Sequence, residues 1–463
     1  MTVIPADVLK HIQENNDSRI NQLIEFLAIP SISASSASAG NMRRAAGWLL
    51  KEAERLGFKG SVIETPGHPI VFAERCPRKD APTLLIYGHY DVQPPEPLEE
   101  WHSRPFEPVI RNHAIYARGA TDDKGQLFTH LKAIESIIAV EGLLPLNVKL
   151  VFEGEEELGS TNFEPFVEAH RELLKADFIA VSDGEKYAKD LPAICYGLRG
   201  LAYMQLDLTG PQFDVHSGLY GGAVANPANA LIKILCSLKD DRGRVLIPGF
   251  YDRVRDLEAW ERREMASLPF DEAEVKKYLG VTSLVPEPGY TAQESMRARP
   301  TLDINGVWGG YSGEGSKTII PAAAGAKVSM RLVPDQDAET VMRQFESYVR
   351  SQVPEGIHLK ITRHHHAEPL LVMRESPAMN VAEKAVEYGF DRKPVLIREG
   401  GSIGAVLTMK KHLGIDDVLM IGFGDPDDNI HSPNEKFSLE NFYRGTVTAA
   451  ALIYGLAEVK KRK

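Results

Sequence analysis

The chain has 463 residues, a net charge of −11 and 43% hydrophobic residues. This length exceeds that of one ordinary domain, so we expect two domains of roughly 100–250 residues each. The acidic balance argues against a nucleic-acid or an anionic-membrane partner, because both bind a basic face. No apolar run reaches the roughly 20 residues that span a membrane, and the three cysteines form no C-x-x-C pair. These features, and a start without a charged segment leading into an apolar one, predict a cytoplasmic protein.

The first part of the chain, up to about residue 199, alternates helical and strand patterns. Apolar residues spaced by three and four positions predict helices, which cover 17–28, 41–56, 124–140 and 161–174. Short apolar runs predict strands, which cover 60–64, 69–74, 83–87, 147–152 and 177–181. A hairpin is expected over 107–118, with Asn112-His113 at its turn. This alternation predicts an α/β sheet flanked by helices.

Around residue 200 the order of expected elements changes to β-α-β-β-α-β, the ferredoxin-like arrangement. These elements cover 201–209, 226–238, 302–308, 325–333, 337–351 and 356–364. A charged insertion over about 240–300 interrupts them, and we expect it to be helical and to lie on the surface. The α/β pattern then returns, with elements at 377–388, 394–398, from 402, at 417–421 and at 438–458. We therefore expect a first domain over 1–199 and 377–463, and a second domain over 200–376 inserted into it.

Acidic and histidine side chains follow the predicted strands at five places. They are His89 and Asp91, Asp122 and Asp123, Glu155, Glu156 and Glu157, Asp183, and His431. Ligands of open α/β sheets gather at the carboxyl ends of strands, and several carboxylates at one edge repel each other unless a cation lies between them. Histidines with carboxylates and no thiolate are the ligands of a catalytic zinc, or of manganese or cobalt. One carboxylate shared by two metals would explain the crowding.

Each of these places has an ordinary explanation when taken alone. His89 could be structural, Asp123 could favour a helix N-terminus, and the run of glutamates could be a solvated loop. Five such places, each after a predicted strand, are much harder to explain in that way. By contrast, the run of three histidines at 364–366 is interpreted as a surface strand end, because neighbours on a strand point to opposite faces. The glycines of R-E-G-G-S-I-G-A suit either an anion site before a helix or a tight turn.

A set of motifs in chain order resembles the aminoacylase/carboxypeptidase/carnosinase family of co-catalytic zinc hydrolases, and within it the cytosolic non-specific dipeptidases. The motifs are G-H-Y-D-V-Q-P, G-A-T-D-D-K-G, E-E-L-G-S, S-D-G, Y-G-L-R-G, D-V-H-S-G-L-Y-G-G, S-K-T-I-I-P, S-M-R-L-V-P, R-E-G-G-S-I and H-S-P-N-E. The resemblance spans about residues 18–460. It implies a zinc-peptidase-type mixed sheet as the catalytic domain, with an inserted ferredoxin-like α+β lid and dimerisation domain.

The resemblance also implies a site with two zinc ions per subunit. His89 and Asp183 would hold one ion, Glu157 and His431 the other, and Asp122 would bridge them.

Two further residues would support the chemistry of that site. Asp91 would orient His89, and Glu156 would be the general base and acid. Glu155 lies outside the family pattern, and the bond between Asp122 and Asp123 would be cis.

Substrate contacts are implied for four residues of other motifs, which are His216, Thr318, Arg331 and Ser402. The planar fork of Arg331 suits a substrate carboxylate, which it can bind through two hydrogen bonds. In the family pattern the chain forms a homodimer, and His216 reaches the site of the partner subunit.

These residues together imply metal-dependent hydrolysis of dipeptides or short peptides by a zinc-activated water. N-acyl amino-acid deacylation, as in an aminoacylase or desuccinylase, is the alternative with the same metal site. The long insertion and the R-E-G-G-S-I motif favour the dipeptidase branch. A non-catalytic binding protein on this scaffold is a third alternative, and the presence of every ligand and of Glu156 argues against it.

Overall fold

The computed structural model describes residues 4–401 and 403–460, so that Ser402, one of the expected substrate contacts, lies outside the described residues. The chain divides into two compact units. Unit 1 holds the chain up to Tyr196 and resumes at Val372, and unit 2 holds Gly197–Leu371. A short segment that begins at Arg398 returns to unit 2 before the chain rejoins unit 1 at Ile403.

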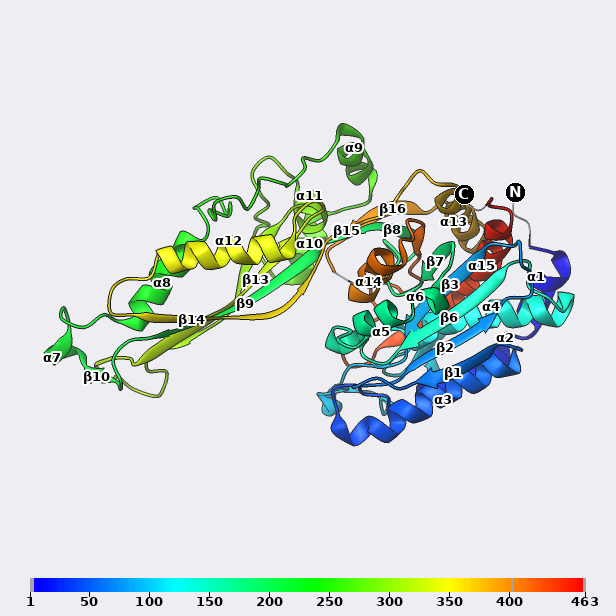
Figure 1. The fold of residues 1–463 in the computed structure, drawn as a ribbon, viewed down its shortest axis with the longest axis horizontal. Helices are drawn as coiled ribbons and strands as arrows, with labels where there is room; N and C mark the ends of the chain where they lie inside the picture. The colour runs from blue at the N-terminus through cyan, green and yellow to red at the C-terminus, as the bar shows by residue number, and fades with distance from the viewer. Residues whose placement is uncertain (1–3, 402, 461–463) are drawn as a thin grey trace. The chain divides into compact units, whose positions relative to one another are not determined.

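A mixed sheet forms the centre of unit 1 (Figure 1). Within residues 4–401 and 403–460 its strands run in the order β1-β2-β6-β3-β7-β17-β8-β15, and β16 also pairs with β8. The bounds are β1 Lys59–Ile63, β2 Ile70–Arg75, β3 Thr83–His89, β6 Asn147–Glu153, β7 Phe178–Val181, β8 Ala193–Leu198, β15 Leu370–Leu371, β16 Val395–Glu399 and β17 Val418–Met420. Strand β3 pairs in parallel with β6 and β7, and β7 in parallel with β17. The carboxyl ends of these four strands therefore meet at one edge of the sheet.

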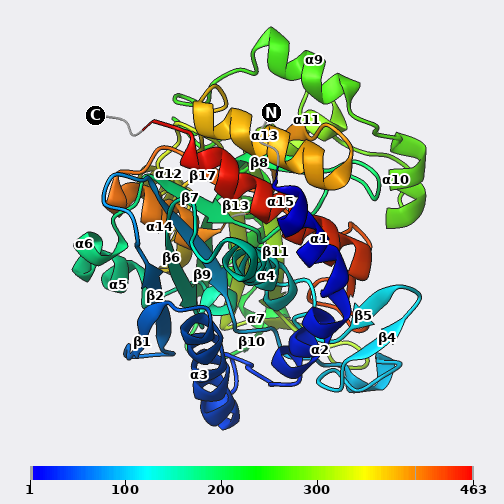
Figure 2. The same cartoon turned by 90° about the vertical axis from the view of Figure 1, so that its right-hand side faces the viewer.

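Helices flank this sheet, as the α/β pattern predicts. Their bounds are α1 Ala6–Glu14, α2 Asn16–Leu27, α3 Ala39–Arg55, α4 Lys124–Glu141, α5 Phe163–Ala169, α6 Arg171–Leu174, α13 Pro377–Phe390, α14 Gly404–Leu413 and α15 Leu439–Ala457. Helix α15 packs against both α13 and α4 (Figure 2), and α3 packs against β1 and β2. Every residue of β6 is buried, which agrees with a central strand covered on both faces.

A small sheet of three strands carries the expected hairpin. Its order is β18-β5-β4, with bounds β4 Val109–Arg111, β5 Ala114–Tyr116 and β18 Lys436–Ser438. Asn112 and His113 both have positive φ, at 49° and 58°, which is the backbone of a tight two-residue hairpin turn. The prediction for this turn is confirmed.

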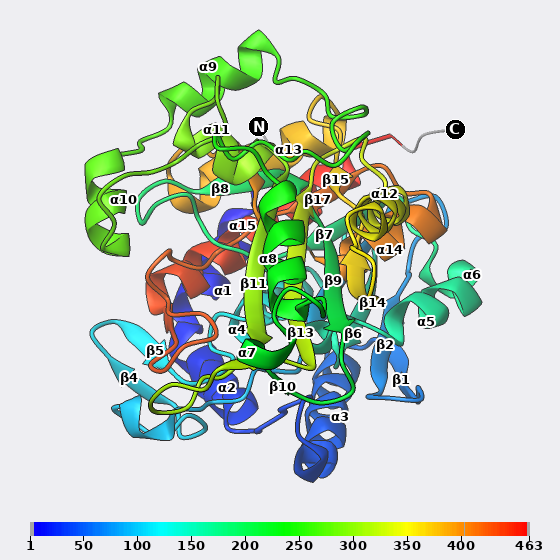
Figure 3. The same ribbon diagram turned by 90° about the vertical axis from the view of Figure 1, so that its left-hand side faces the viewer.

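Unit 2 has the ferredoxin-like arrangement that the sequence predicts. Its elements are β9 Gly200–Thr209, α8 Pro227–Ser237, β11 Thr301–Gly309, β13 Ala323–Leu332, α12 Ala338–Ser351 and β14 His358–Ala367. The strands form an antiparallel sheet in the order β11-β13-β9-β14, and α8 and α12 lie against it (Figure 3). Burial alternates along β9, so one face of the sheet packs on the helices through a core that includes Met204, Val328 and Phe345.

Two short strands and four helices complete unit 2. They are β10 Val215–His216, α7 Ser217–Tyr220, α9 Ala259–Ser267, α10 Glu272–Leu279, α11 Ala292–Ala298 and β12 Ile319–Ile320. Helices α9, α10 and α11 thus lie in the charged insertion expected over about 240–300, with non-helical segments before and between them, and α10 has no buried residue. None of the described helices combines the length with the hydropathy that a membrane span requires.

One helix prediction is wrong. The segment 161–174 is not a single helix, because α5 and α6 are separated at His170. The His170 ring stacks on Phe166 at 4.6 Å, and its Nδ1 lies 2.9 Å from the Phe166 carbonyl oxygen. The backbone of His170, with φ −117° and ψ 27°, departs from helical geometry and ends α5.

Candidate metal centre

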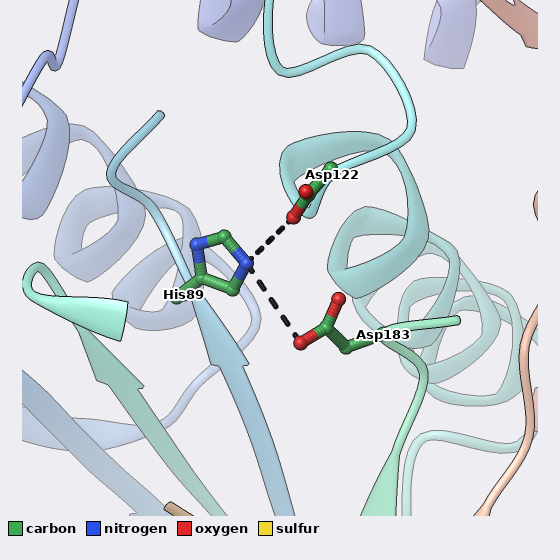
Figure 4. A group of neighbouring side chains, drawn as sticks. All are labelled: His89, Asp122 and Asp183. Carbon is green, nitrogen blue, oxygen red and sulfur yellow. Dashed lines mark hydrogen bonds and ion pairs between the residues drawn. The ribbon is translucent and has the colours of Figure 1, made fainter. Parts of the chain in front are cut away.

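The edge where β3, β6, β7 and β17 end brings the predicted acidic and histidine residues together. His89 is the last residue of β3, and Asp183 follows β7 by two positions. His89 Nε2 lies 2.9 Å from Asp122 Oδ1 and 3.9 Å from Asp183 Oδ2. Figure 4 shows this one ring nitrogen facing both carboxylates. His89 is fully buried, so these three groups form a compact polar site at the sheet edge.

A second group lies on the other side of Asp122. His431 Nε2 is 2.9 Å from Asp122 Oδ2 and 3.1 Å from Glu157 Oε2. His431 comes from the loop between β17 and β18, and Glu157 from the loop after β6. Asp122 therefore offers one carboxylate oxygen to each histidine. In each group the candidate ligand atoms lie within 4.8 Å of one another.

The carboxylates of the site stabilise positive charge at two places, one beside His89 and one beside His431. Burial works to lower the pKa of His89, but hydrogen bonds with Asp122 and Asp91, together with Asp183, raise it well above its ordinary value. Hydrogen bonds with Asp122 and Glu157 raise the pKa of His431 to about 10. Positive charge at both histidines is thus stabilised by the carboxylates around them. Imidazole nitrogens with carboxylate oxygens are the donors that zinc and related divalent ions bind, so the residues fit two such ions.

Asp91 ties His89 to the loop after β6. His89 Nδ1 lies 3.0 Å from the Asp91 carbonyl oxygen and 3.4 Å from its carboxylate. The same carboxylate accepts hydrogen bonds from the backbone N–H groups of Glu156 and Glu157, at 3.2 and 3.1 Å. A partner on Nδ1 fixes the ring and leaves Nε2 for a metal.

Glu156 begins a short 3-10 helix, Glu156–Leu158, beside these groups. Burial raises the pKa of the Glu156 carboxyl well above its ordinary value, and the charges of Asp183, Asp122 and Glu157 raise it further. A half-buried carboxyl that holds and releases a proton is suited to acid and base chemistry.

Sequence analysis missed Glu435, which organises the loop that carries Asp122. Glu435 is fully buried, and its Oε2 accepts from Arg118 Nη1 at 2.8 Å and from the Gly119 N–H at 2.9 Å. Its Oε1 accepts from the N–H groups of Thr121 and Asp122, at 3.0 and 3.1 Å. The signal was present, because Glu435 is the last residue of the H-S-P-N-E motif. The peptide bond between Asp122 and Asp123 is cis, as the resemblance implies.

Two other neighbours of the site have clear partners. Gln93, which the sequence did not indicate, donates from Nε2 to Glu157 Oε2 at 2.7 Å. Glu155 is buried and accepts from the His68 N–H at 3.0 Å and from Asn162 Nδ2. Glu155 therefore holds a loop together, in agreement with its place outside the family pattern.

The expected substrate contacts of unit 2 lie in two separate places. His216 and Thr318 are neighbours, since β10 pairs with β12 and the Ser217 N–H donates to the Thr318 carbonyl at 3.1 Å. Arg331 lies near the end of β13, in register with Thr301 of β11. Its side chain is half-buried and has no hydrogen bond or ion pair with any described residue, so it can accept an anionic ligand.

The run of three histidines at 364–366 lies on an exposed part of β14, where the register with β9 shifts. The rings of His364 and His365 lie against Tyr203, at 5.5 and 5.3 Å. None of the three belongs to a group of described residues that could hold a metal, which agrees with a surface strand.

The sequence model of "Peptidase family M20/M25/M40" matches residues 85–455. The chain belongs to this peptidase family. The M20 relative "Cys-Gly metallodipeptidase dug1" of Schizosaccharomyces pombe is 32% identical over 467 aligned residues, which cover 97% of each chain. The M20 metallo-carboxypeptidase Sso-CP2 of Sulfolobus solfataricus superposes with a TM-score of 0.85 at 35% identity, over 95% of this chain and 99% of that one. Human carnosine dipeptidase 1 superposes with a TM-score of 0.82 at 28% identity, over 98% of each chain. The family and the fold expected from the motifs are confirmed.

Proposed function

We propose that this M20 peptidase hydrolyses the peptide bond of dipeptides and very short peptides in a metal-dependent reaction. The observation that carries the proposal is the pair of ligand groups that share Asp122. The named dipeptidases among its relatives support the substrate class, because the similarity extends over nearly the whole of both chains.

We propose that each subunit holds two zinc ions, which manganese or cobalt could replace. His89 and Asp183 would hold one ion, Glu157 and His431 the other, and Asp122 would lie between them. A bound ion of this kind supplies an activated water and polarises the scissile carbonyl.

The chain's own residues would do the remaining work. Asp91 would keep His89 oriented through Nδ1, and Glu435 would hold the backbone of Asp122 in place. Glu156 would take a proton from the attacking water at its carboxylate and return it to the leaving amine. Arg331 would bind the C-terminal carboxylate of the substrate, and Ser402 would add contacts near it.

We further propose a homodimer in which His216 acts in the site of the partner subunit. His216 and Thr318 lie by the start of β13 at Ala323, whereas Arg331 lies eight residues further along that strand. Eight residues of a strand span about 26 Å, and a dipeptide spans only about 7 Å. One substrate therefore cannot touch His216 and Arg331 of the same chain.

The edge strand β11 has the exposed apolar surface that a dimer would cover. Ile304, Val307 and Trp308 are exposed by 46%, 58% and 42%. Nucleic-acid and membrane partners are not part of this proposal. The chain would act in the cytoplasm, where its cysteines, which form no disulfide with one another, stay reduced.

A substrate series on the metal-reconstituted protein tests the proposal. We expect a dipeptide to be cleaved faster than a tripeptide, a longer peptide or an N-acetyl amino acid, and metal removal by a chelator to abolish the cleavage. Preference for the N-acetyl amino acid would favour a deacylase instead. Stepwise trimming of long peptides from the C-terminus would favour a carboxypeptidase, the second candidate, because the carboxypeptidase of S. solfataricus is 35% identical. Metal binding without any cleavage would favour a binding protein.

A further inference from the structure

The loop 398–401, which leads to Ser402, is part of unit 2 although the residues on both sides of it belong to unit 1. Nothing in the local sequence explains this placement. The contacts of the loop do explain it, because they come from the charged insertion at about 240–300 and from Arg199, all within unit 2.

Arg398 anchors the first residue of the loop. Its side chain is 7% exposed, and its Nη2 forms a close ion pair with Glu261 of α9, which is 3% exposed. Arg297 of α11 donates from Nη1 to the Arg398 carbonyl oxygen at 3.0 Å. The head group and the backbone of Arg398 are therefore both held by helices of the insertion.

Glu261 is itself fixed by the start of α9. Its Oε2 accepts a hydrogen bond from the Glu258 N–H at 3.0 Å, because Glu261 is the third helical residue of α9 and closes a capping box with Glu258. Its Oε1 forms the ion pair with Arg398. The N-terminus of α9 thus sets the position of the carboxylate that Arg398 contacts.

Arg199 holds the next two residues of the loop. Its backbone N–H donates to the Glu399 carbonyl at 3.2 Å, and its Nε donates to the Gly400 carbonyl at 3.3 Å. A Cβ on Gly400 would lie 2.8 Å from Arg199 Nη2 and 3.2 Å from the Met296 carbonyl oxygen, so an alanine here would displace the Arg199 head group that holds the loop. A Cβ on Gly401 would meet nothing within 4 Å.

We infer that the insertion is a positioning device: Glu261, through Arg398, holds the loop 398–401 in the conformation that receives the C-terminal carboxylate of the substrate. This inference rests on the proposed function, which puts Ser402 near that carboxylate. Stability alone does not explain a buried ion pair, because apolar side chains of the same volume typically stabilise a fold to the same degree or more. The ion pair of Glu261 and Arg398 also fixes the direction of the Arg398 side chain, and with it the start of the loop, which apolar side chains would not do.

The first test is hydrogen exchange of the loop backbone, with metals bound. Glu261→Gln keeps an acceptor for the capping box but removes the charge that faces Arg398. We expect amide exchange at 399–401 to accelerate roughly tenfold or more in this variant. Gly400→Ala should have the same effect, and Gly401→Ala, which adds a methyl group in open space, should not. Glu339→Gln, which breaks an exposed ion pair with Arg363 in the same unit, is the control.

The second test compares a dipeptide with the corresponding dipeptide amide, which lacks the carboxylate. We expect Glu261→Gln to lower kcat/KM for the dipeptide about tenfold, mainly through KM, and to change the amide much less. Unchanged exchange at 399–401, or equal losses on both substrates, would overturn the inference. If the wild type with metals bound cleaved neither compound, the proposed function would fail and the substrate part of the inference with it. The exchange result would still decide whether Glu261 holds the loop.

Discussion

The Oε1 atom of Glu435 accepts a hydrogen bond from the backbone N–H of Asp122, at 3.1 Å. The residue that would lie between two metal ions is thus held by a buried carboxylate 313 positions away in the chain. Groups that orient metal ligands typically change metal affinity by about 10- to 100-fold when they are replaced.

Replacement of Glu435 should therefore weaken metal binding. In Glu435→Gln we expect a loss of affinity of about 10- to 100-fold, measured by competition with a chelator. Glu440→Gln, which alters an exposed glutamate paired with Arg444, serves as the control. Equal affinities in the Glu435 variant and the wild type would show that the loop holds Asp122 without this carboxylate.

Glu156→Ala should retain both metal ions and lose activity. Loss of a general acid and base lowers kcat by about 10²- to 10⁴-fold, and metal content is measured in the same preparation. Glu155→Gln is the matched variant, because Glu155 is the adjacent residue and bonds only to a loop. It should lower the melting temperature with little effect on kcat. A Glu156 variant with the wild-type kcat would contradict the assigned role.

The dimer proposal predicts that two inactive variants rescue each other. His216→Ala and Arg331→Ala should each be nearly inactive. In a mixed dimer one site would combine the intact Arg331 of one chain with the intact His216 of the other. Random mixing gives half mixed dimers with one complete site each, and so about a quarter of wild-type activity. No recovery after denaturation and joint refolding would mean that both residues act in the same subunit.

Glu153 should make the stability of the protein depend on pH. Burial raises the pKa of its carboxyl to about 8, against the hydrogen bonds that Tyr87 and Ser160 donate to it. The folded state thus favours the protonated form, and stability is lost as the pH rises from about 5 through 8.

The variant Glu153→Gln keeps the acceptor oxygen and cannot ionise. At pH 5 its free energy of unfolding should match that of the wild type, and above pH 8 it should exceed the wild type by roughly 4 kcal/mol. Urea unfolding of both proteins at several pH values measures the difference. Parallel curves for the two proteins would contradict the assigned protonation.

Much of the fold and of the site can be predicted from local patterns. The apolar run of β3 is continuous and ends at His89, so both the strand and the ligand are visible in the sequence. The helix break at His170 is not visible, because it depends on contacts of that ring with Phe166. Glu435 was missed for a related reason. Its place in the H-S-P-N-E motif marks it as a candidate, but its hydrogen bonds to backbone N–H groups of distant residues leave no periodicity or spacing that would indicate its role.

The pair of Glu261 and Arg398 shows the same limit at longer range. The two residues are 137 positions apart. Glu261 occurs in the charged insertion, whereas Arg398 ends the apolar element expected over 394–398, so neither local pattern indicates the pair. Their burial is apparent only once the insertion and the loop fold against each other.

The return of 398–401 to unit 2 has a practical consequence for dissecting the protein. A fragment cut at the long segment Gly197–Leu371 would include Glu261 but omit Arg398. It would then contain a buried carboxylate without its cation, which typically costs about 3–5 kcal/mol. Arg199 and Arg297 would also lose carbonyl acceptors in that loop. A stable isolated version of unit 2 therefore requires that the segment beginning at Arg398 be joined to Gly197–Leu371 in one chain, for example through a linker or a circular permutation.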